Sequence, residues 1–290
     1  MYFFLKFFDC LHNKTKSFTF GVMKSNKLNT SIIFTLLNIV SLFSLAQPQS
    51  GKKIEPKSSK KMKVEIWSDV MCPFCYIGKR KFEAALAKFE YKNHVEVIWK
   101  SFQLQPDMVT NPTKNTLEHL AESKGWTLAY TKQVTSQVVQ MAKEVGLNYD
   151  FDKAVVANSF DAHRLSHFAK SKGKGDAIEE QLFKAYFIDG KNTADHATLT
   201  QLAVSIGLNE TEVKQILTSD SFAIEVRQDI YESQQIGVTG VPYFVLNNKY
   251  AISGAQSSET FLGALQKAWS ETEKPTIIEG PACTPDGSCD

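Results

Sequence analysis

Residues 63–78 read KVEIWSDVMCPFCYIG, and within this stretch the sequence changes from a strand pattern to a helix pattern. Polar and apolar residues alternate over residues 63–67, which predicts a short strand. From Cys72 to Phe89 apolar residues recur at helical spacings, which predicts a helix. Residues 95–102 are rich in β-branched and aromatic side chains and predict a second strand. Strand, helix and strand in this order predict a βαβ unit, whose two strands lie parallel in one sheet.

A Cys-Pro-Phe-Cys motif, residues 72–75, lies where the first strand leads into the helix. Unpaired N–H groups and the positive end of the helix dipole stabilise a thiolate there, so we predict that Cys72 is a nucleophile. Pro73 suits the first position of a helix, because its missing N–H would be unpaired there. Cys75 returns to the same face and can form a disulfide with Cys72 or attack a mixed disulfide on it. We therefore expect thiol–disulfide chemistry, with Cys72 exposed and Cys75 shielded.

The rest of the body predicts a helical block followed by two more strands. Residues 117–207 carry repeated amphipathic runs and almost no strand signal. After this block the pattern predicts a helix, two strands joined by a tight turn, and a closing helix, at residues 211–235, 241–246, 250–252 and 259–270 with the turn at 247–249. The order predicts an α/β protein with one mixed central sheet and an inserted all-helical domain.

Pro242 starts the first of these later strands and follows the stretch Gly237-Val-Thr-Gly240. A trans proline in an ordinary turn would suit this position. A cis bond after Val241 would instead let the backbone N–H and C=O of Val241 pair with an extended substrate beside the two cysteines. The sequence leaves the isomer open.

With these motifs, the chain from Lys63 to Ser270 resembles the DsbA-like thiol-disulfide oxidoreductases, and most closely their FrnE-type branch. The resemblance rests on segments that occur in family order, namely DVMCPFCYIG (69–78), FQLQP (102–106), DAHRL (161–165), AYF (185–187), GVTGVPYF (237–244) and ISGAQ (252–256). It implies a thioredoxin-like fold, with Cys72 as the attacking thiol, Cys75 as the resolving thiol and Pro242 as a cis-proline opposite them. It also implies protein thiols and disulfides as substrates, and a separate redox partner.

The organisation of the chain follows from the motifs and the resemblance together. We assign residues 63–110 and 208–272 to a thioredoxin-like domain, residues 111–207 to a helical insertion, and residues 273–290 to a C-terminal tail. We expect Pro73, Phe74 and Val241 to contact the substrate.

Residues 1–46 differ from the rest, since they hold five Lys, one acidic residue and eight of the 20 Phe. From Met23, which is an alternative start of the protein, a basic stretch precedes the apolar run 32–45, and small residues end at Ala46. This layout predicts a secretory signal peptide and export, most simply to the periplasm, without stable membrane insertion after cleavage. A membrane anchor is the alternative, but the apolar run is shorter than the roughly 20 residues of a spanning helix. Residues 47–62 predict a flexible linker.

The charge of the body is nearly balanced. The chain has 33 basic and 31 acidic residues, and without residues 1–46 the remainder carries 28 basic and 30 acidic side chains, a net charge of −2. This remainder lacks the basic surface that nucleic-acid binding requires. We expect no nucleic-acid partner, and no motif predicts a cofactor.

Cys283 and Cys289 form a second close pair near the C-terminus. Residues 284–288, TPDGS, favour a turn that brings the two cysteines together, and disulfides persist in exported proteins. We expect a disulfide between them that acts as a structural clip, with a second redox pair that exchanges with Cys72 as the alternative. The four cysteines could also hold zinc, but their spacings suit it poorly, so we expect no metal.

His163 and His167 lie four residues apart on an expected helix, as a pair of metal ligands would. We favour a structural interpretation, with one histidine capped or facing solvent and the other packed, because the sequence places no carboxylate or Cys ligand beside them.

Two other functions are compatible with the same scaffold. Glutathione-dependent isomerases of the hydroxychromene-carboxylate isomerase type resemble it but carry Ser in place of the first Cys. A non-catalytic chaperone or binding module would need neither thiol. The presence of both Cys72 and Cys75 favours the oxidoreductase, although the sequence does not predict whether it acts as oxidase, reductase or isomerase.

Overall fold

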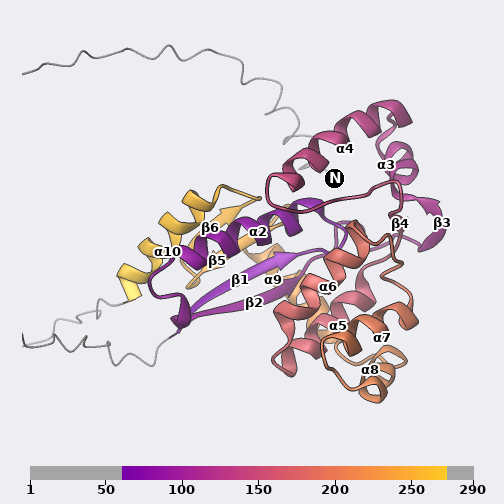
Figure 1. Ribbon diagram of the computed structural model, residues 1–290. Coiled ribbons are helices and arrows are strands. Elements are labelled where there is room, and N and C mark those ends of the chain that lie inside the picture. The colour runs from indigo at the N-terminus through magenta and orange to yellow at the C-terminus, as the bar shows by residue number, and fades with distance from the viewer. Residues whose placement is uncertain (1–60, 273–290) are drawn as a thin grey trace, which may run out of the picture. The chain divides into compact units, whose positions relative to one another are not determined.

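A four-stranded mixed sheet forms the centre of residues 61–272, which are the residues that the computed structural model describes. Its strands are β1 (Met62–Ser68), β2 (Val95–Ser101), β5 (Tyr243–Leu246) and β6 (Tyr250–Ser253), in the spatial order β2-β1-β5-β6 (Figure 1). The predicted signal peptide and the pair Cys283 and Cys289 lie outside the described residues.

The pairing of the strands confirms the mixed sheet. β1 and β2 are parallel, with Ile66 opposite Trp99, and helix α2 (Pro73–Lys88) connects them. β1 and β5 are antiparallel, with Ile66 opposite Phe244, and β5 pairs with β6 in the same sense. The hairpin turns at Asn247 and Asn248, whose φ values of 49° and 55° lie in the left-handed region that a tight hairpin needs. The chain therefore leaves the sheet after β2 and returns to it at β5, as the sequence predicts.

Two helices cover one face of the sheet, and a third packs on the other. α2 and α10 (Ser258–Thr272) lie side by side (Figure 1). Phe82 of α2, Phe244 of β5 and Phe261 of α10 form an aromatic cluster, with ring centroids 4.6–5.7 Å apart. On the opposite face, α9 (Ala223–Gln235) packs against β2, and the Trp67 indole donates to its Asp229 carbonyl at 2.9 Å.

The segment between β2 and α9 is mostly helical. Its helices are α3 (Thr116–Lys124), α4 (Leu128–Lys143), α5 (Phe160–Ser171), α6 (Gly175–Phe187), α7 (His196–Ser205) and α8 (Glu210–Leu217). A short 3-10 turn, η1 (Lys92–His94), lies outside this segment, between α2 and β2. It also contains an antiparallel pair, β3 (Asn111–Asn115) with β4 (Val155–Val156), which the sequence analysis did not anticipate. α5 packs against α6, α7, α8 and α9. The domain boundaries at 111 and 207 stay predictions.

The single helix expected over residues 211–235 is wrong, because the chain forms two helices there. α8 ends at Leu217, and α9 begins at Ala223 after Phe222 takes a left-handed conformation with φ 64°. Between them, Ser221 donates its N–H to the Ser219 hydroxyl at 3.3 Å. Serine side chains compete in this way for backbone groups that a helix would use, so the polar stretch favours a break.

A buried cation joins α2 to α6. Lys79 is 2% exposed, and its ammonium group contacts Glu83, Asp176 at 3.4 Å and Glu180 at 3.2 Å. Burial opposes the charge, but these carboxylates outweigh it and raise the pKa of Lys79 above its usual value, so the side chain stays protonated. The helix that carries the cysteines is thus tied to the segment inserted between the two halves of the sheet.

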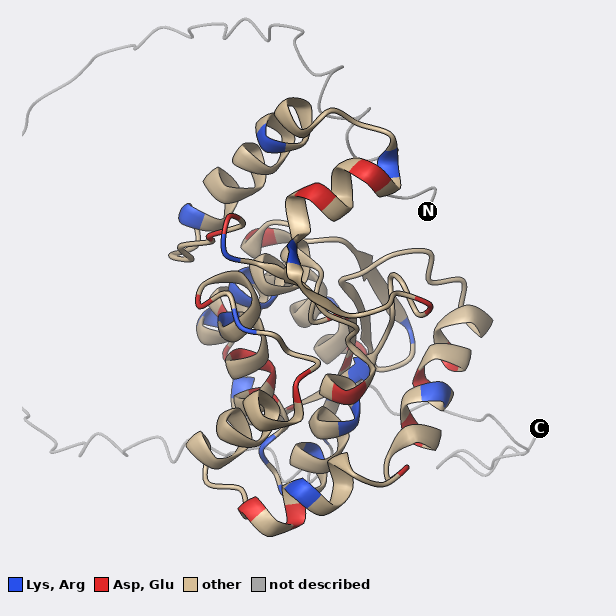
Figure 2. Ribbon diagram, turned by 90° about the vertical axis from the view of Figure 1, so that its right-hand side faces the viewer, with Lys and Arg blue, Asp and Glu red and all other residues tan. Residues whose placement is uncertain are grey.

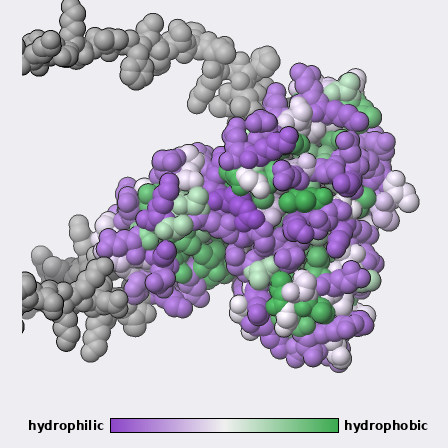
Figure 3. All heavy atoms as spheres, viewed as in Figure 1, coloured by the Kyte–Doolittle hydropathy of each residue, from purple (hydrophilic) through white to green (hydrophobic). Residues whose placement is uncertain are grey.

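Neither one sign of charge nor hydrophobic residues dominate the surface of the described residues in the views shown. Basic and acidic residues lie on the same helices (Figure 2). The face in Figure 3 is mostly hydrophilic, with hydrophobic residues in separate patches. Over residues 61–272, every helix is too short or too polar to cross a membrane.

Candidate active site

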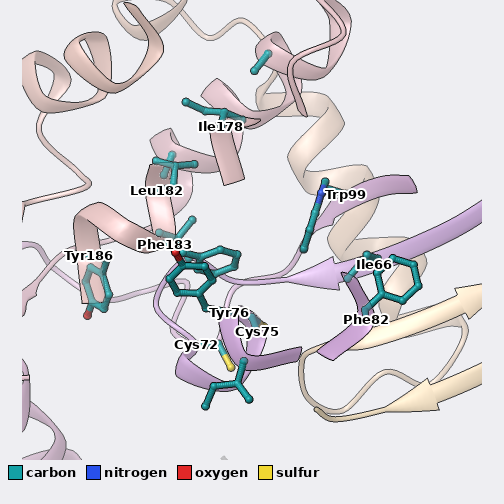
Figure 4. Packing of buried hydrophobic residues seen from close by; sticks show 14 of the residues in the cluster. Ile66, Cys72, Cys75, Tyr76, Phe82, Trp99, Ile178, Leu182, Phe183 and Tyr186 are labelled. Atoms are coloured by element: carbon teal, nitrogen blue, oxygen red, sulfur yellow. The ribbon is translucent and has the colours of Figure 1, made fainter. Parts of the chain in front are cut away.

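The Cys-Pro-Phe-Cys turn starts helix α2, as the sequence predicts. Cys72 is the N-cap residue, with φ −90° and ψ 111°, and Pro73 is the first helical residue. The Cys72 N–H donates to the Asp69 carbonyl at 2.9 Å, and the Cys75 N–H donates to the Cys72 carbonyl at 3.0 Å. Both thiols are free, and Figure 4 shows the two residues at the start of the helix. The turn therefore places Cys72 at the N-terminal end of α2 and Cys75 within the first helical turn.

The loop before β5 lies against this turn. The bond between Val241 and Pro242 is cis, which answers the question that the sequence left open. The Cys72 thiol donates to the Val241 carbonyl, with Sγ and O 3.3 Å apart. The Pro242 ring packs on α2 at Gly78, where an added Cβ would lie 2.9 Å from Pro242 Cγ. Segments 169 residues apart in the sequence thus meet at Cys72.

Replacing Gly78 with Ala is expected to lower the free energy of unfolding by about 1–3 kcal/mol, because the new methyl group overlaps the rigid Pro242 ring. Gly263 is a matched control, since it lies in helix α10 with no atom within 4 Å of an added Cβ. Gly263→Ala should stabilise the protein by about 0.5–1 kcal/mol through helix propensity. Urea unfolding of both variants measures the difference, and an equal gain in both would contradict the tight packing at Gly78.

Cys72 is not exposed, so that part of the sequence-based prediction is wrong. Both cysteines are only 1% exposed. Cys72 lies beneath Val241, and Tyr149, which the sequence analysis missed, donates its hydroxyl to the Pro73 carbonyl at 2.7 Å. Tyr149 follows α4 and stacks on Phe187 of α6, with ring centroids 4.7 Å apart. Burial, followed by the charges of the two cysteines, raises the pKa of Tyr149 well above its usual value, so it remains a neutral donor.

Cys75 has an environment that keeps its thiol protonated. Burial raises the pKa of Cys75 well above its usual range, and the hydrogen bond to Cys72 and the charge of that residue act in the same direction. The Ser68 hydroxyl and the Asp69 backbone N–H act in the opposite direction, because each favours the thiolate. Cys75 is therefore held as a protonated thiol in the resting dithiol.

A buried ion pair lies behind the cysteines. Asp69 is fully buried, and its carboxylate accepts the Leu104 N–H at 2.7 Å and the Met71 N–H at 3.4 Å. His163 is 2% exposed, and its Nε2 lies 3.5 Å from Asp69 Oδ1, which is too long for a strong hydrogen bond. Burial opposes protonation of His163, but the Asp69 carboxylate and the charge of Glu179 outweigh it and raise the pKa of this histidine.

The interpretation of His163 and His167 from the sequence needs correction. Neither faces solvent, and each has a carboxylate beside it, because long-range folding supplies partners that sequence spacing does not reveal. His167 Nε2 lies 2.9 Å from Asp229 Oδ2 and 3.2 Å from Ser101 Oγ. The two histidines therefore contact separate carboxylates. Within residues 61–272 no three His, Cys, Asp or Glu side chains are grouped as metal ligands.

A groove of about 700 Å³ adjoins this site. It runs along residues 104–111 and is bounded by Lys114, His119 and Ser123 near α3 and by Val156 of β4. Leu104 belongs to the groove and also donates its N–H to Asp69, so one backbone segment contributes to both features. Neither cysteine lines the groove.

Comparisons with known proteins agree with the thioredoxin-like fold. The family model described as the DSBA-like thioredoxin domain matches residues 63–266. A probable DsbA oxidoreductase from Streptomyces coelicolor is 38% identical, with a TM-score of 0.71 over 79% of this chain and 98% of that one. The protein YwbO of Bacillus subtilis is 29% identical over 73% of this chain and 97% of its own length. The cytosolic disulfide reductase DsbM from Pseudomonas aeruginosa shares the fold, with 13% identity and a TM-score of 0.52 over 72% of this chain and 99% of that one.

Proposed function

Because the chain belongs to the DSBA-like thioredoxin domain family and is a disulfide oxidoreductase of the DsbA-like class, we propose that it exchanges disulfides with protein thiols through Cys72 and Cys75. The observation that carries the proposal is the position of Cys72 Sγ, at the start of α2 and 3.3 Å from the Val241 carbonyl. Cys72 thus lies at the start of a helix and beside a backbone carbonyl that an extended substrate chain can pair with.

The reaction proceeds in two exchanges. The Cys72 thiolate attacks one sulfur of a substrate disulfide, the substrate S–S bond breaks, and one substrate thiolate leaves and takes up a proton. Cys75 then loses its proton and attacks Cys72 Sγ, which releases the second substrate thiol and leaves a Cys72–Cys75 disulfide. The substrate is reduced by two electrons and the cysteine pair is oxidised. The reverse sequence oxidises a substrate dithiol, and the redox partner decides the direction.

Val241 is the residue that would hold the substrate chain. Its carbonyl is occupied by the Cys72 thiol in the resting dithiol, and its N–H makes no backbone hydrogen bond to any other residue in 61–272. An extended substrate can pair with both groups once Cys72 has turned toward the incoming sulfur. Pro73 and Phe74, which are both half-buried at the start of α2, would contact the substrate on the other side of the attacking thiol.

The proposed location is an exported, extracytoplasmic one, most simply the periplasm. It rests on the signal-peptide layout that ends at Ala46 and on the second cysteine pair in the tail. In such a compartment a DsbA-like enzyme meets unfolded chains with free thiols, and disulfides once formed persist.

Turnover of the purified full-length protein tests the proposed function. A peptide with two cysteines and a fluorescent reporter is oxidised or reduced in a glutathione buffer at neutral pH, with and without the protein. We expect the protein to accelerate exchange in a way that depends on its own concentration. No acceleration in either direction would contradict the proposal.

The tail cysteines are expected to be linked to each other after expression in an oxidising compartment. In a Cys75→Ser variant, peptide mapping should then find the Cys283–Cys289 disulfide and find Cys72 joined only to added substrate thiols. The reason is that the loop between Cys283 and Cys289 is short and its Pro-Asp-Gly sequence favours a turn. A disulfide from Cys72 to either tail cysteine would instead assign the pair to the redox cycle.

A further inference from the structure

Tyr149 is a side chain through which the inserted helical segment reaches the active-site turn. It lies between α4 and β4, in a stretch of chain that crosses the start of α2 (Figure 1). Its hydroxyl donates to the Pro73 carbonyl at 2.7 Å, although the two residues lie 76 positions apart in the sequence. Pro73 stands between the two cysteines, so this hydrogen bond is made to the backbone of the turn that carries both thiols.

The ring of Tyr149 packs against two other aromatic rings. It stacks on Phe187 of α6 with ring centroids 4.7 Å apart, and on Tyr76 of α2 at 6.1 Å. Tyr76 in turn stacks on Phe183 at 5.1 Å (Figure 4). Tyr149 is 6% exposed, and the next residue, Asp150, donates its N–H to the Phe187 carbonyl at 2.8 Å. The packing and this backbone bond hold the side chain in place, so its hydroxyl is presented to the turn in a fixed position.

The turn is a part of the molecule where such a restraint matters, because helices fray at their ends. Cys72 is the N-cap residue of α2, and Cys75 lies in its first turn. The Cys75 N–H donates to the Cys72 carbonyl at 3.0 Å, which closes the turn around Pro73 and Phe74. A hydrogen bond to the carbonyl of Pro73 therefore restrains the segment that sets the distance between the two sulfurs.

The second exchange step depends on that distance. Cys75 must attack the Cys72 sulfur, and a disulfide between them forms without strain only when their Cβ atoms are about 3.5–4.5 Å apart. Misplacing reacting groups by about 1 Å can cost about a hundredfold in rate. The first step joins Cys72 to a separate molecule, so it requires no fixed distance between the two cysteines.

We propose that Tyr149 is a positioning residue for the second exchange step, and that its hydrogen bond to the Pro73 carbonyl holds the turn so that Cys75 reaches the Cys72 sulfur. The inference rests on the proposed function, since it concerns one of its two steps. Tyr149 acts through the backbone and transfers no proton. Burial raises the pKa of Tyr149 well above its usual value, so its hydroxyl remains a donor at the pH values at which thiols react.

A coloured disulfide reagent separates the two steps in one experiment. The full-length protein, with Cys10, Cys283 and Cys289 replaced by Ser, is reduced and mixed with one equivalent of dithiobis(nitrobenzoate). The first thionitrobenzoate is released when Cys72 attacks the reagent, and the second when Cys75 attacks the mixed disulfide on Cys72. Stopped-flow absorbance follows the two releases as separate phases over a range of pH.

In Tyr149→Phe the second release should slow about three- to tenfold, because the turn is held less firmly while the aromatic packing is kept. The first release should be unchanged. The pH at which the second release reaches half its maximum rate should also be unchanged, because the substitution alters the geometry of the turn and not the ionisation of the thiols. Hydrogen exchange measured by NMR should find the Cys75 amide, which is bonded to the Cys72 carbonyl, less protected than before.

Tyr186→Phe is the matched control. Tyr186 also packs on Phe187, with ring centroids 4.9 Å apart, and is 1% exposed, but its hydroxyl pairs with the Thr116 hydroxyl at 3.4 Å. Both phases should match those of the protein with both tyrosines intact. A second release in Tyr149→Phe as fast as in this control would overturn the proposal. Slowing of both phases together, or a shifted pH midpoint at an unchanged maximum rate, would also overturn it. A missing first release with Tyr149 intact would overturn the proposed function instead.

Discussion

Replacing Cys72 with Ser is expected to reduce the rate of disulfide exchange by at least about a thousandfold, because a hydroxyl cannot supply the thiolate that attacks a disulfide. Cys75 cannot take over this role. Cys75 is buried, and burial raises its pKa well above the usual range. Turnover of the fluorescent dithiol peptide measures the loss.

The fold of the Cys72→Ser variant should be retained, because the exchange of sulfur for oxygen removes little volume. Unchanged circular dichroism and an unchanged urea midpoint provide that control. Cys75→Ser is the informative comparison, since it should keep the first attack and lose the second. Residual turnover in Cys72→Ser above about one-tenth of the original rate would show that another group attacks the substrate.

Replacing Asp69 with Ala is expected to lower the free energy of unfolding by about 3–5 kcal/mol, because it breaks a buried pair and leaves its partner without compensation. Asp69 is fully buried, accepts two backbone N–H groups and faces His163. Denaturant unfolding measures the loss. Asp189→Ala is the control, since Asp189 is 30% exposed and pairs at 3.2 Å with Lys184, which is 49% exposed, so it should cost less than about 1 kcal/mol.

The contact between Asp69 and His163 also predicts how the destabilisation by Asp69→Ala depends on pH. The folded-state pKa of His163 is raised above its unfolded value, so its contribution to stability is complete below about pH 6.5 and is lost as pH rises through the folded pKa. The stability difference between the unsubstituted protein and Asp69→Ala should therefore be larger at about pH 6 than at about pH 9. Asp69 and Glu179 are the acidic groups that act on His163, and a difference that grows with pH would contradict this assignment.

Local patterns in the sequence predicted the strands and the helix that position the two cysteines. The alternation over residues 63–67 and the helical spacing after Cys72 predicted β1 and α2, and the Asn-Asn turn predicted the hairpin of β5 and β6. These features depend on neighbours within a few residues, so the sequence carries them directly.

Contacts between distant segments account for what the sequence did not predict. Tyr149 has no local motif, yet its hydroxyl reaches the Pro73 carbonyl because the segment after α4 folds back over α2. The burial of Cys72 likewise depends on Val241, which lies in the loop before β5. Asp69 lay inside the stretch that decides the fold, but only the folded chain brings its carboxylate to Leu104 and His163. The site therefore depends on contacts that only the folded chain makes, between residues that no local motif links.

Trapping the reaction halfway tests most directly the claim that Cys72 attacks and Cys75 resolves. The Cys75→Ser variant is mixed with an unfolded protein substrate that carries one disulfide, quenched with acid, and mapped by mass spectrometry. The account predicts a stable mixed disulfide between the substrate and Cys72, absent from the unsubstituted protein, which resolves it, and from Cys72→Ser. A substrate disulfide found on any other cysteine, or no covalent complex at all, would contradict it.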